Sequence, residues 1–299
     1  MSAIGATGAK GNDMRRLLAT LIGTALVLGV AVCPVSAADS RGVARSVSDS
    51  TAAAKPKKGD KYVALGSSIA SGFGISVQST PCGRSSRDYG QLVAARYKLD
   101  LVDVSCGAAL ISHVTDTPQG DNPPQITAVT PDTKLITVSV GGNDIVYNAT
   151  ALGCGSPTNV CTGPPDLDAR LASARTELAD MLDQLEAAAP KATIVFVTYP
   201  REVPRTGNCP ELSFTDDEAE IVRSLGEQLE EMFVEVAKRR GIVFVDPYAA
   251  RGDHTGCASP SQRWTAGNVA DDGFAYHPTA LGHEVMAKMI NKALNNTQR

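Results

Sequence analysis

Four residues in separate parts of the chain are of types that can combine for nucleophilic catalysis. Ser68 lies in the stretch KYVALGSSIASG, where a hydrophobic run ends in glycine and serines, and His277 lies in FAYHPTALGHE. Gly107 lies in SCGAAL and Asn143 in GGNDI. Ester hydrolysis needs a nucleophile, a base that takes its proton, and hydrogen-bond donors for the oxyanion. Taken singly, each residue is also explained as a helix cap or a turn residue, so their positions in the fold must decide.

Five short hydrophobic runs predict the strands that would position these residues. They are rich in β-branched residues and do not alternate with polar residues, as expected of strands whose two faces are both covered by helices. The runs are YVALG (62–66), LDLVDVS (99–105), KLITVSVGG (134–142), ATIVFVTYP (192–200) and GIVFVDPY (241–248).

Helical patterns lie between and after these runs. The segment 215–241 carries an apolar stripe at helical spacing, with Thr215 and Glu218 placed to form a capping box. Helices are also predicted within 164–190 and 279–294. The stripe consists of Ile221, Leu225, Leu229, Met232 and Val236. This alternation predicts a single doubly wound α/β domain with a five-stranded parallel sheet, in which sites form outside the carboxyl ends of the strands.

The four candidate residues follow strands or open the last helix, and their sequence contexts resemble the SGNH (GDSL-type) hydrolase family. ALGSSIASG resembles the first block of that family, SCGAAL the second, VSVGGND the third and YHPTALGH the last. The resemblance runs from about Lys61 to the C-terminus and is closest to secreted actinobacterial lipases and esterases with six cysteines. Ser67 stands where the first block usually has aspartate. Because that residue is not the nucleophile, the change weakens the motif match more than the mechanism.

The resemblance implies a role for each candidate residue. Ser68 would be the nucleophile, and His277 would be its general base and then the acid for the leaving alcohol. The oxyanion hole would consist of the Ser68 N–H, the Gly107 N–H and the Asn143 side-chain amide. The expected activity is hydrolysis of lipid or small acyl esters, with no cofactor and no metal.

The sequence leaves open which group accepts a hydrogen bond from the His277 ring and orients it. The family usually has aspartate three residues before the histidine, and this chain has Phe274 there. Asp271 and Asp272 would reach the ring only if the loop folds over. The carbonyl of Phe274 or Ala275 can instead accept a hydrogen bond from Nδ1 and fix the tautomer, and we favour this Ser–His dyad.

Two other functions remain open besides the lipase or esterase. One is a sugar-ester deacetylase of the same family, and the other is a catalytically weak or non-catalytic binding module on this fold. A single tryptophan, Trp264, argues mildly against an aromatic platform for carbohydrate. Apolar residues beyond the nucleophile would either contact an acyl chain or pack the loop: Ile69, Phe73, Ile75 and Val77.

The N-terminus is typical of an export signal. Arg15 and Arg16 precede the apolar run 17–32, and small residues follow that suit cleavage after Ala37. We therefore expect a signal peptide over 1–37, a flexible linker over 38–60 and the hydrolase domain over 61–299. The mature protein would be secreted, to the medium or the cell envelope, without a stable membrane anchor.

Charge and cysteine content agree with this interpretation. The formal net charge is −4, and removal of residues 1–37 leaves 25 basic and 31 acidic residues, which excludes nucleic acid as an expected partner. Six cysteines remain, which permit 15 pairings. Their neighbourhoods, supported by the resemblance, indicate disulfides that hold the loops of the site: Cys82–Cys106, Cys154–Cys161 and Cys209–Cys257.

Overall fold

The computed structural model describes most of the region expected to form the domain. The described residues are 55–79, 81–270 and 272–296. The expected signal peptide and most of the expected linker lie outside them. A turn over 57–60 already belongs to the domain, because the Gly59 N–H donates to the Lys98 carbonyl at 2.9 Å. The described residues before Lys61 are therefore in contact with the domain.

All five predicted strands are present, and they form one parallel sheet in the order β4-β1-β5-β6-β7. Three of the strands, β1, β5 and β6, are buried on both faces, which explains their unbroken hydrophobic runs. The strands are β1 (Lys61–Gly66), β4 (Asp100–Asp103), β5 (Leu135–Ser139), β6 (Thr193–Val197) and β7 (Val243–Val245). The predicted fold class is confirmed.

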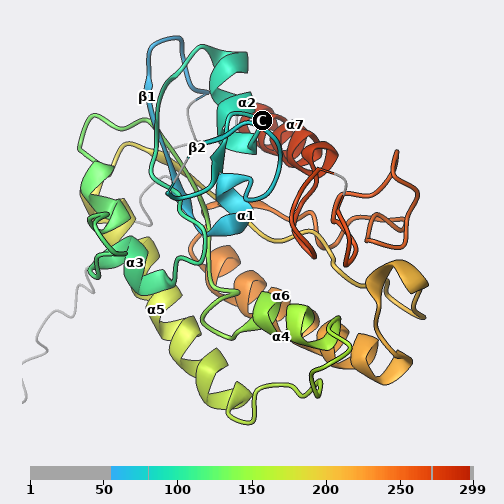
Figure 1. The fold of residues 1–299 in the computed structure, drawn as a ribbon. Helices are drawn as coiled ribbons and strands as arrows, with labels where there is room; N and C mark the ends of the chain where they lie inside the picture. The colour runs from blue at the N-terminus through green and yellow to red at the C-terminus, as the bar shows by residue number, and fades with distance from the viewer. Residues whose placement is uncertain (1–54, 80, 271, 297–299) are drawn as a thin grey trace, which may run out of the picture. The chain divides into compact units, whose positions relative to one another are not determined.

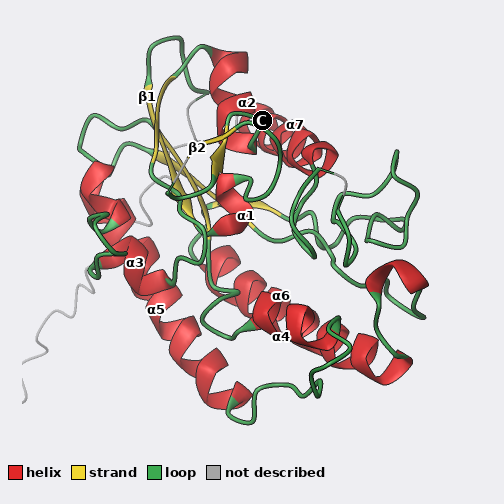
Figure 2. Cartoon of the chain, in the orientation of Figure 1, coloured by secondary structure: helices red, strands yellow, loops and turns green. Residues whose placement is uncertain are grey.

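Helices cover both faces of this sheet (Figures 1 and 2). Helices α2 and α7 pack together on one face, and α3, α5 and α6 lie on the other. The helices are α1 (Ser68–Ser71), α2 (Tyr89–Tyr97), α3 (Ile111–Thr115), α4 (Tyr147–Cys154), α5 (Leu167–Ala188), α6 (Asp216–Arg239) and α7 (Ala280–Asn296), with short 3₁₀ turns η1 (Gln125–Ala128) and η2 (Pro210–Leu212). None of the helices in the described part of the chain has the length and hydrophobicity to cross a bilayer.

Helix α6 begins where its sequence predicts. The Thr215 side chain accepts a hydrogen bond from the Glu218 N–H, and the Glu218 carboxylate accepts one from the Thr215 N–H at 2.7 Å. This reciprocal capping box satisfies two N–H groups that a helix start otherwise leaves unpaired. The predicted apolar stripe packs into the core, with Ile221 only partly buried at its end.

The chain order across the sheet reverses between β1 and β5. In doubly wound sheets the binding crevice forms at such a switch point, outside the carboxyl ends of the strands. The residues that follow these two strands include Ser68 and Asn143. The topology therefore brings two of the predicted site residues to the same place.

Three disulfides hold the loops at this end of the sheet. A two-stranded hairpin, β2 (Gln78–Ser79) with β3 (Arg84–Ser85), is joined to the loop after β4 through its turn. The bonded pairs are Cys82–Cys106, Cys154–Cys161 and Cys209–Cys257. These are the pairs indicated by the sequence neighbourhoods. A native bridge of this kind typically contributes about 2–5 kcal/mol to stability.

Candidate active site

Ser68 and His277 are in direct contact, although 209 positions separate them in the sequence. The distance from His277 Nε2 to Ser68 Oγ is 2.9 Å, within hydrogen-bond range. Ser68 opens α1 directly after β1, and His277 lies in the loop before α7. The two residues are only 6% and 4% exposed. The fold thus places a hydroxyl and an imidazole in the geometry of a nucleophile with its base.

The other nitrogen of the His277 ring contacts a backbone carbonyl. Nδ1 lies 2.8 Å from the Ala275 oxygen, which can only accept, so Nδ1 carries the proton and Nε2 presents its lone pair to Ser68. The Phe274 carbonyl accepts the backbone N–H of His277 instead, at 3.1 Å. Burial lowers the pKa of His277 to about 4, against the opposing effect of the Ala275 hydrogen bond, so the ring is neutral at neutral pH.

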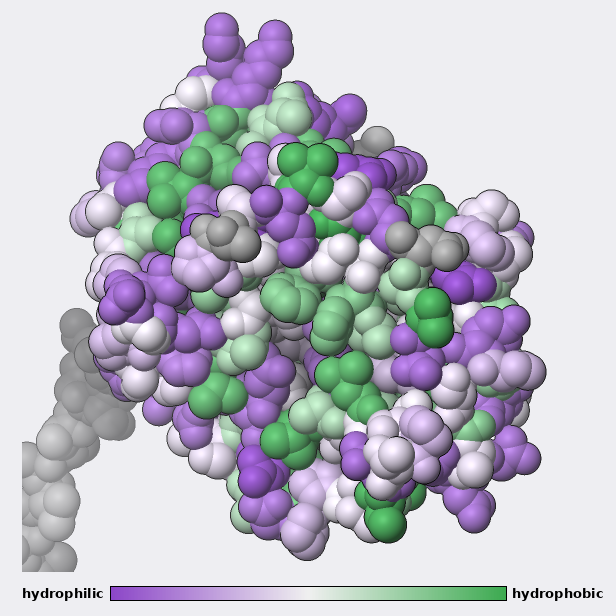
Figure 3. All heavy atoms as spheres, viewed as in Figure 1, coloured by the Kyte–Doolittle hydropathy of each residue, from purple (hydrophilic) through white to green (hydrophobic). Residues whose placement is uncertain are grey.

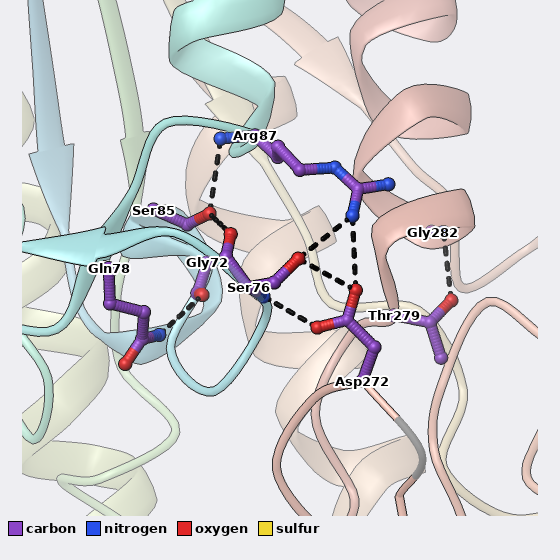
Figure 4. A network of polar contacts seen from close by, with 8 residues as sticks. All are labelled: Gly72, Ser76, Gln78, Ser85, Arg87, Asp272, Thr279 and Gly282. Atoms are coloured by element: carbon purple, nitrogen blue, oxygen red, sulfur yellow. Dashed lines mark hydrogen bonds and ion pairs between the residues drawn. The ribbon is translucent and has the colours of Figure 1, made fainter.

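Asp272, one of the alternative partners of His277, is bonded elsewhere (Figure 4). Its carboxylate accepts hydrogen bonds from the Ser76 N–H at 2.5 Å and from the Ser76 hydroxyl at 3.1 Å. It also forms an ion pair with Arg87 at 3.0 Å. We call these contacts of Asp272 with Ser76 and Arg87, which join the loop before α7 to the segments on either side of the β2–β3 hairpin, the Asp272 clasp. Asp271 lies outside the described residues.

Gly66 ends β1 in a conformation that brings Ser68 into place. Its φ is +129°, and a Cβ there would lie 2.2 Å from the Ser139 oxygen of the neighbouring strand. The Gln125 side chain donates to the Gly66 oxygen at 3.0 Å and accepts from the Gly66 N–H at 2.7 Å. Sequence reasoning did not find Gln125, because an amide that binds a distant backbone leaves no local pattern.

Asn143 follows β5 in the GGND stretch, and its side chain points to the loop after β4. Nδ2 donates to the Ala109 carbonyl at 2.9 Å, which uses one of its two hydrogens. The preceding Gly142 packs against Tyr199, where a Cβ would lie 2.5 Å from the ring. The Tyr199 hydroxyl accepts from the Gly142 N–H at 3.1 Å and lies 3.3 Å from the Ser67 hydroxyl. The family's aspartate position therefore holds a buried serine against a tyrosine.

Gly107 lies at the site, but its N–H has a different partner from the one expected. This N–H donates to the Cys82 carbonyl at 2.9 Å, so it is committed to the disulfide-linked hairpin rather than left free for an oxyanion. The glycine itself is required by packing, because a Cβ would lie 2.9 Å from the Phe73 ring. The Ser68 N–H, by contrast, has no hydrogen-bond partner among the described residues.

Two phenylalanines border the Ser68–His277 pair. The Phe73 and Phe274 rings meet edge to face at 5.2 Å, and the Phe274 ring lies 5.1 Å from that of His277. Phe274 is 37% exposed, whereas Ile69 and Ile75 are buried and pack the loop. Figure 3 shows that hydrophobic residues are scattered among hydrophilic ones over this view of the molecule, with a hollow near its centre. Phe274 therefore presents a partly exposed apolar ring beside His277.

The remaining histidines have structural partners. His113 Nδ1 accepts from the Leu110 N–H at 2.9 Å at the start of α3, and His254 stacks on Trp264 with ring centroids 3.9 Å apart. His283 is buried in α7 against Tyr89. Across the part of the chain that the structure describes, no group of three or more histidine, cysteine, aspartate or glutamate residues is arranged to hold a metal ion.

The chain is similar to known lipases and esterases of Streptomyces species. The chain is 28% identical over 267 residues to Lipase 2 of Streptomyces coelicolor, covering 82% of this chain and 90% of the relative. It is 27% identical to an esterase of Streptomyces scabiei, covering 80% and 87%. The crystal structure of an extracellular lipase from Streptomyces rimosus superimposes with a TM-score of 0.64 at 25% identity, covering 78% of this chain and 99% of that one.

A family profile spans most of the domain. The profile described as "GDSL-like Lipase/Acylhydrolase family" matches residues 64–285, which include the Ser68–His277 pair and Asn143. This match confirms the resemblance found in the sequence blocks. The chain therefore belongs to the GDSL-like lipase/acylhydrolase family of carboxylic-ester hydrolases.

Proposed function

We propose that the chain hydrolyses esters of lipids or small acyl groups through an acyl-enzyme on Ser68. The observation that carries the proposal is the 2.9 Å contact between His277 Nε2 and Ser68 Oγ. A neutral imidazole in that position can remove the hydroxyl proton as the oxygen attacks the acyl carbonyl.

The two half-reactions use the same pair of residues. Ser68 Oγ attacks the acyl carbon while its proton passes to His277 Nε2, and a tetrahedral oxyanion forms. The imidazolium then gives that proton to the oxygen of the leaving alcohol, the carbon–oxygen bond breaks, and the acyl group remains on Ser68. In the second half, His277 takes a proton from water, the resulting hydroxide oxygen attacks the acyl carbon, and the proton returns to Ser68 Oγ as the carboxylic acid leaves.

The Ser68 N–H and the Asn143 side chain each offer a hydrogen-bond donor to the oxyanion. The Ser68 N–H has no partner among the described residues, and the second hydrogen of Asn143 Nδ2 remains after its bond to Ala109. Donors of this kind stabilise the charge that develops in the transition state, and loss of one typically costs about 2.7–4 kcal/mol. The Ala275 carbonyl stabilises the imidazolium through Nδ1–H, less strongly than a carboxylate would.

The surroundings of the pair favour an acyl chain as the group that binds next to it. Phe73 and Phe274 present an apolar border, and relatives of the chain are named lipase and esterase. A phospholipase A1 from Streptomyces albidoflavus shares the fold, with a TM-score of 0.63 at 24% identity. A sugar-ester deacetylase is the alternative outcome. Activity on acetylated polysaccharide, measured against a lipid emulsion, separates the two.

Export is part of the proposal. Three disulfides within the described residues suit an oxidising compartment, and the N-terminal sequence is typical of a signal peptide. The relative from Streptomyces rimosus is titled an extracellular lipase. The mature chain should begin at Ala38, which N-terminal sequencing of the secreted protein tests.

Hydrolysis of a p-nitrophenyl ester series by wild type and Ser68→Ala tests the chemistry. We expect the substitution to lower kcat by about 10⁴-fold or more, because the nucleophile is removed. Wild type, but not the variant, should gain the mass of a fluorophosphonate adduct on Ser68. Ser71→Ala is the matched control, since Ser71 is a buried serine of the same short helix whose hydroxyl, among the described residues, bonds the Ser68 carbonyl alone. Turnover by Ser68→Ala at the rate of the control would disprove the proposal.

A further inference from the structure

The loop after β4 makes a tight turn against Phe73, whose ring centroid lies 6.2 Å from that of His277. The Ala109 N–H donates to the Cys106 carbonyl at 3.1 Å, which closes a four-residue turn with Gly107 and Ala108 at its centre. Ala108 has φ of +61°, and Gly107 does not have positive φ. This is the pattern of a type II turn, whose third position favours glycine. An alanine held there against its preference is the kind of outlier that accumulates at functional sites.

The central peptide of this turn is fixed from one side. The Gln119 Nε2 donates to the Gly107 carbonyl at 2.7 Å. In a trans peptide the C=O and the following N–H point in opposite directions. The Ala108 N–H therefore points away from Gln119. It has no hydrogen-bond partner among the described residues, and Ala108 is exposed.

The turn lies between two parts of the proposed site. On one side, Gly107 packs against the Phe73 ring, which is 6.2 Å from the His277 ring. On the other side, the Ala109 carbonyl accepts the hydrogen bond from Asn143 Nδ2. The Ala108 N–H thus belongs to the residue directly before Ala109, whose carbonyl Asn143 binds, while the Gly107 N–H is committed to Cys82.

We propose that the Ala108 N–H is the second backbone donor of the oxyanion hole, and that Gln119 is the residue that positions it. The inference rests on the proposed function and specifies one of its parts. Rotation of the Gly107–Ala108 peptide would convert the turn to type I, relieve the positive φ of Ala108 and turn its N–H away. The Gln119 hydrogen bond opposes that rotation.

Among the described residues, the Gln119 side chain makes one hydrogen bond, the one to the Gly107 carbonyl. Its backbone N–H and carbonyl bond Asn122 at 2.9 and 3.1 Å, which fixes the position of the residue. Its side-chain Oε1 is buried without a hydrogen-bond partner in the described part of the chain. The backbone of Gln119 is therefore held in place by Asn122, and its side chain is left to bind the Gly107 carbonyl.

Replacement of single backbone amides by esters tests the donor directly. Lactic acid in place of Ala108 removes that N–H, and we expect kcat to fall about 10²–10³-fold with KM little changed. Glycolic acid in place of Gly107 removes the bond to Cys82, and should lower the unfolding temperature while kcat stays within a few-fold of wild type. If the ester at 107 abolishes turnover and the ester at 108 does not, the assignment is overturned.

Substitution of Gln119 tests the positioning role. Gln119→Met removes the donor at similar volume, and kcat should fall about 10-fold or more while KM and the unfolding temperature change little. Affinity for a boronic acid, which mimics the tetrahedral state, should weaken in parallel. Gln228→Met is the control, because Gln228 is also partly buried and also donates to a backbone carbonyl, that of Ser224 on α6.

Rescue separates positioning from a structural role. Glycine favours the type II turn by itself, so Ala108→Gly added to Gln119→Met should restore most of the lost kcat. No rescue, with kcat lost together with thermal stability, would overturn the role of Gln119. Ser68→Ala stays in every assay: activity in that variant counts against the proposed function itself, whereas an inactive Ser68→Ala beside an unaffected ester at 108 counts against this inference alone.

Discussion

The loop before α7 and the first turns of α7 each contain a buried histidine, and the two rings are bonded in opposite ways. His277 donates through Nδ1 to the Ala275 carbonyl and presents Nε2 to the Ser68 hydroxyl. His283 accepts the Tyr89 N–H through Nδ1 at 3.2 Å, so its proton is on Nε2, which has no partner among the described residues. The same side chain thus adopts two tautomers within one short segment.

Burial does not distinguish these two regions. It lowers the pKa of His277 to about 4 and that of His283 to about 3. Both rings are therefore neutral at neutral pH, and a perturbed pKa identifies neither as a base. The difference is that the His277 lone pair faces a hydroxyl at the carboxyl end of β1, whereas the His283 lone pair is used to cap the start of α2. The hydrogen-bond partner, rather than the pKa, identifies the catalytic candidate.

Substituting each of the two histidines in turn should give the largest difference in kcat between the two regions. His277→Asn should lower kcat for p-nitrophenyl esters by about 10⁴-fold, because Ser68 loses its base and the remaining donors cannot replace it. His283→Asn should leave kcat nearly unchanged and lower the free energy of unfolding by about 1–3 kcal/mol, through the weakened bond to the Tyr89 N–H. Steady-state kinetics and urea unfolding measure the two effects. Equal losses of kcat in both variants would remove the distinction.

The pH dependence of kcat/KM gives an intermediate effect. The reaction needs neutral His277, and its lowered pKa keeps the ring neutral down to about pH 4. The acid limb of kcat/KM should therefore have its midpoint near 4 instead of the ordinary histidine value of about 6.5. In His283→Asn this limb should be unchanged. A midpoint near 6.5 in both proteins would contradict a base desolvated by burial.

The free energy of unfolding should also decrease as pH falls over the same range. A histidine with a lowered pKa in the folded state takes up its proton more readily when the chain is unfolded. Each of the two rings therefore reduces stability as pH falls from about 6.5 toward its folded value. The fall in the free energy of unfolding over this range should be smaller in His283→Asn than in wild type, because one of the two rings is then missing.

The sequence predicts those features of the fold and the site that leave a pattern over a few neighbouring residues. The five hydrophobic runs predict the strands, and the topology then brings Ser68 and Asn143 to one edge of the sheet. The HP pair before the last helix predicts where His277 lies. These features depend on periodicity, strand ends and glycines that cannot carry a side chain, all of which can be read over a few residues.

The features that the sequence does not predict depend on contacts between distant backbone and side-chain groups. The amides of Gln119 and Gln125 bind carbonyls in other loops, and nothing in their neighbourhood indicates this. The motif assigns the Gly107 N–H to the oxyanion, whereas in the structure this N–H donates to the Cys82 carbonyl of the disulfide-linked hairpin. The choice between Asp272 and a carbonyl likewise depended on how the loop before α7 folds.

Asp272→Asn is the smallest expected effect and the sharpest test of the His277 region. The Asp272 clasp is partly exposed, so loss of its ion pair with Arg87 should lower the free energy of unfolding by about 1 kcal/mol or less. We expect kcat to change no more than a few-fold, because the Ala275 carbonyl orients the ring. If the carboxylate instead held the imidazole as in an aspartate triad, kcat would fall about 10⁴-fold. Asp166→Asn, which breaks a comparable exposed ion pair with Arg170, is the matched control, and a large loss of kcat in Asp272→Asn alone would show that the dyad assignment is wrong.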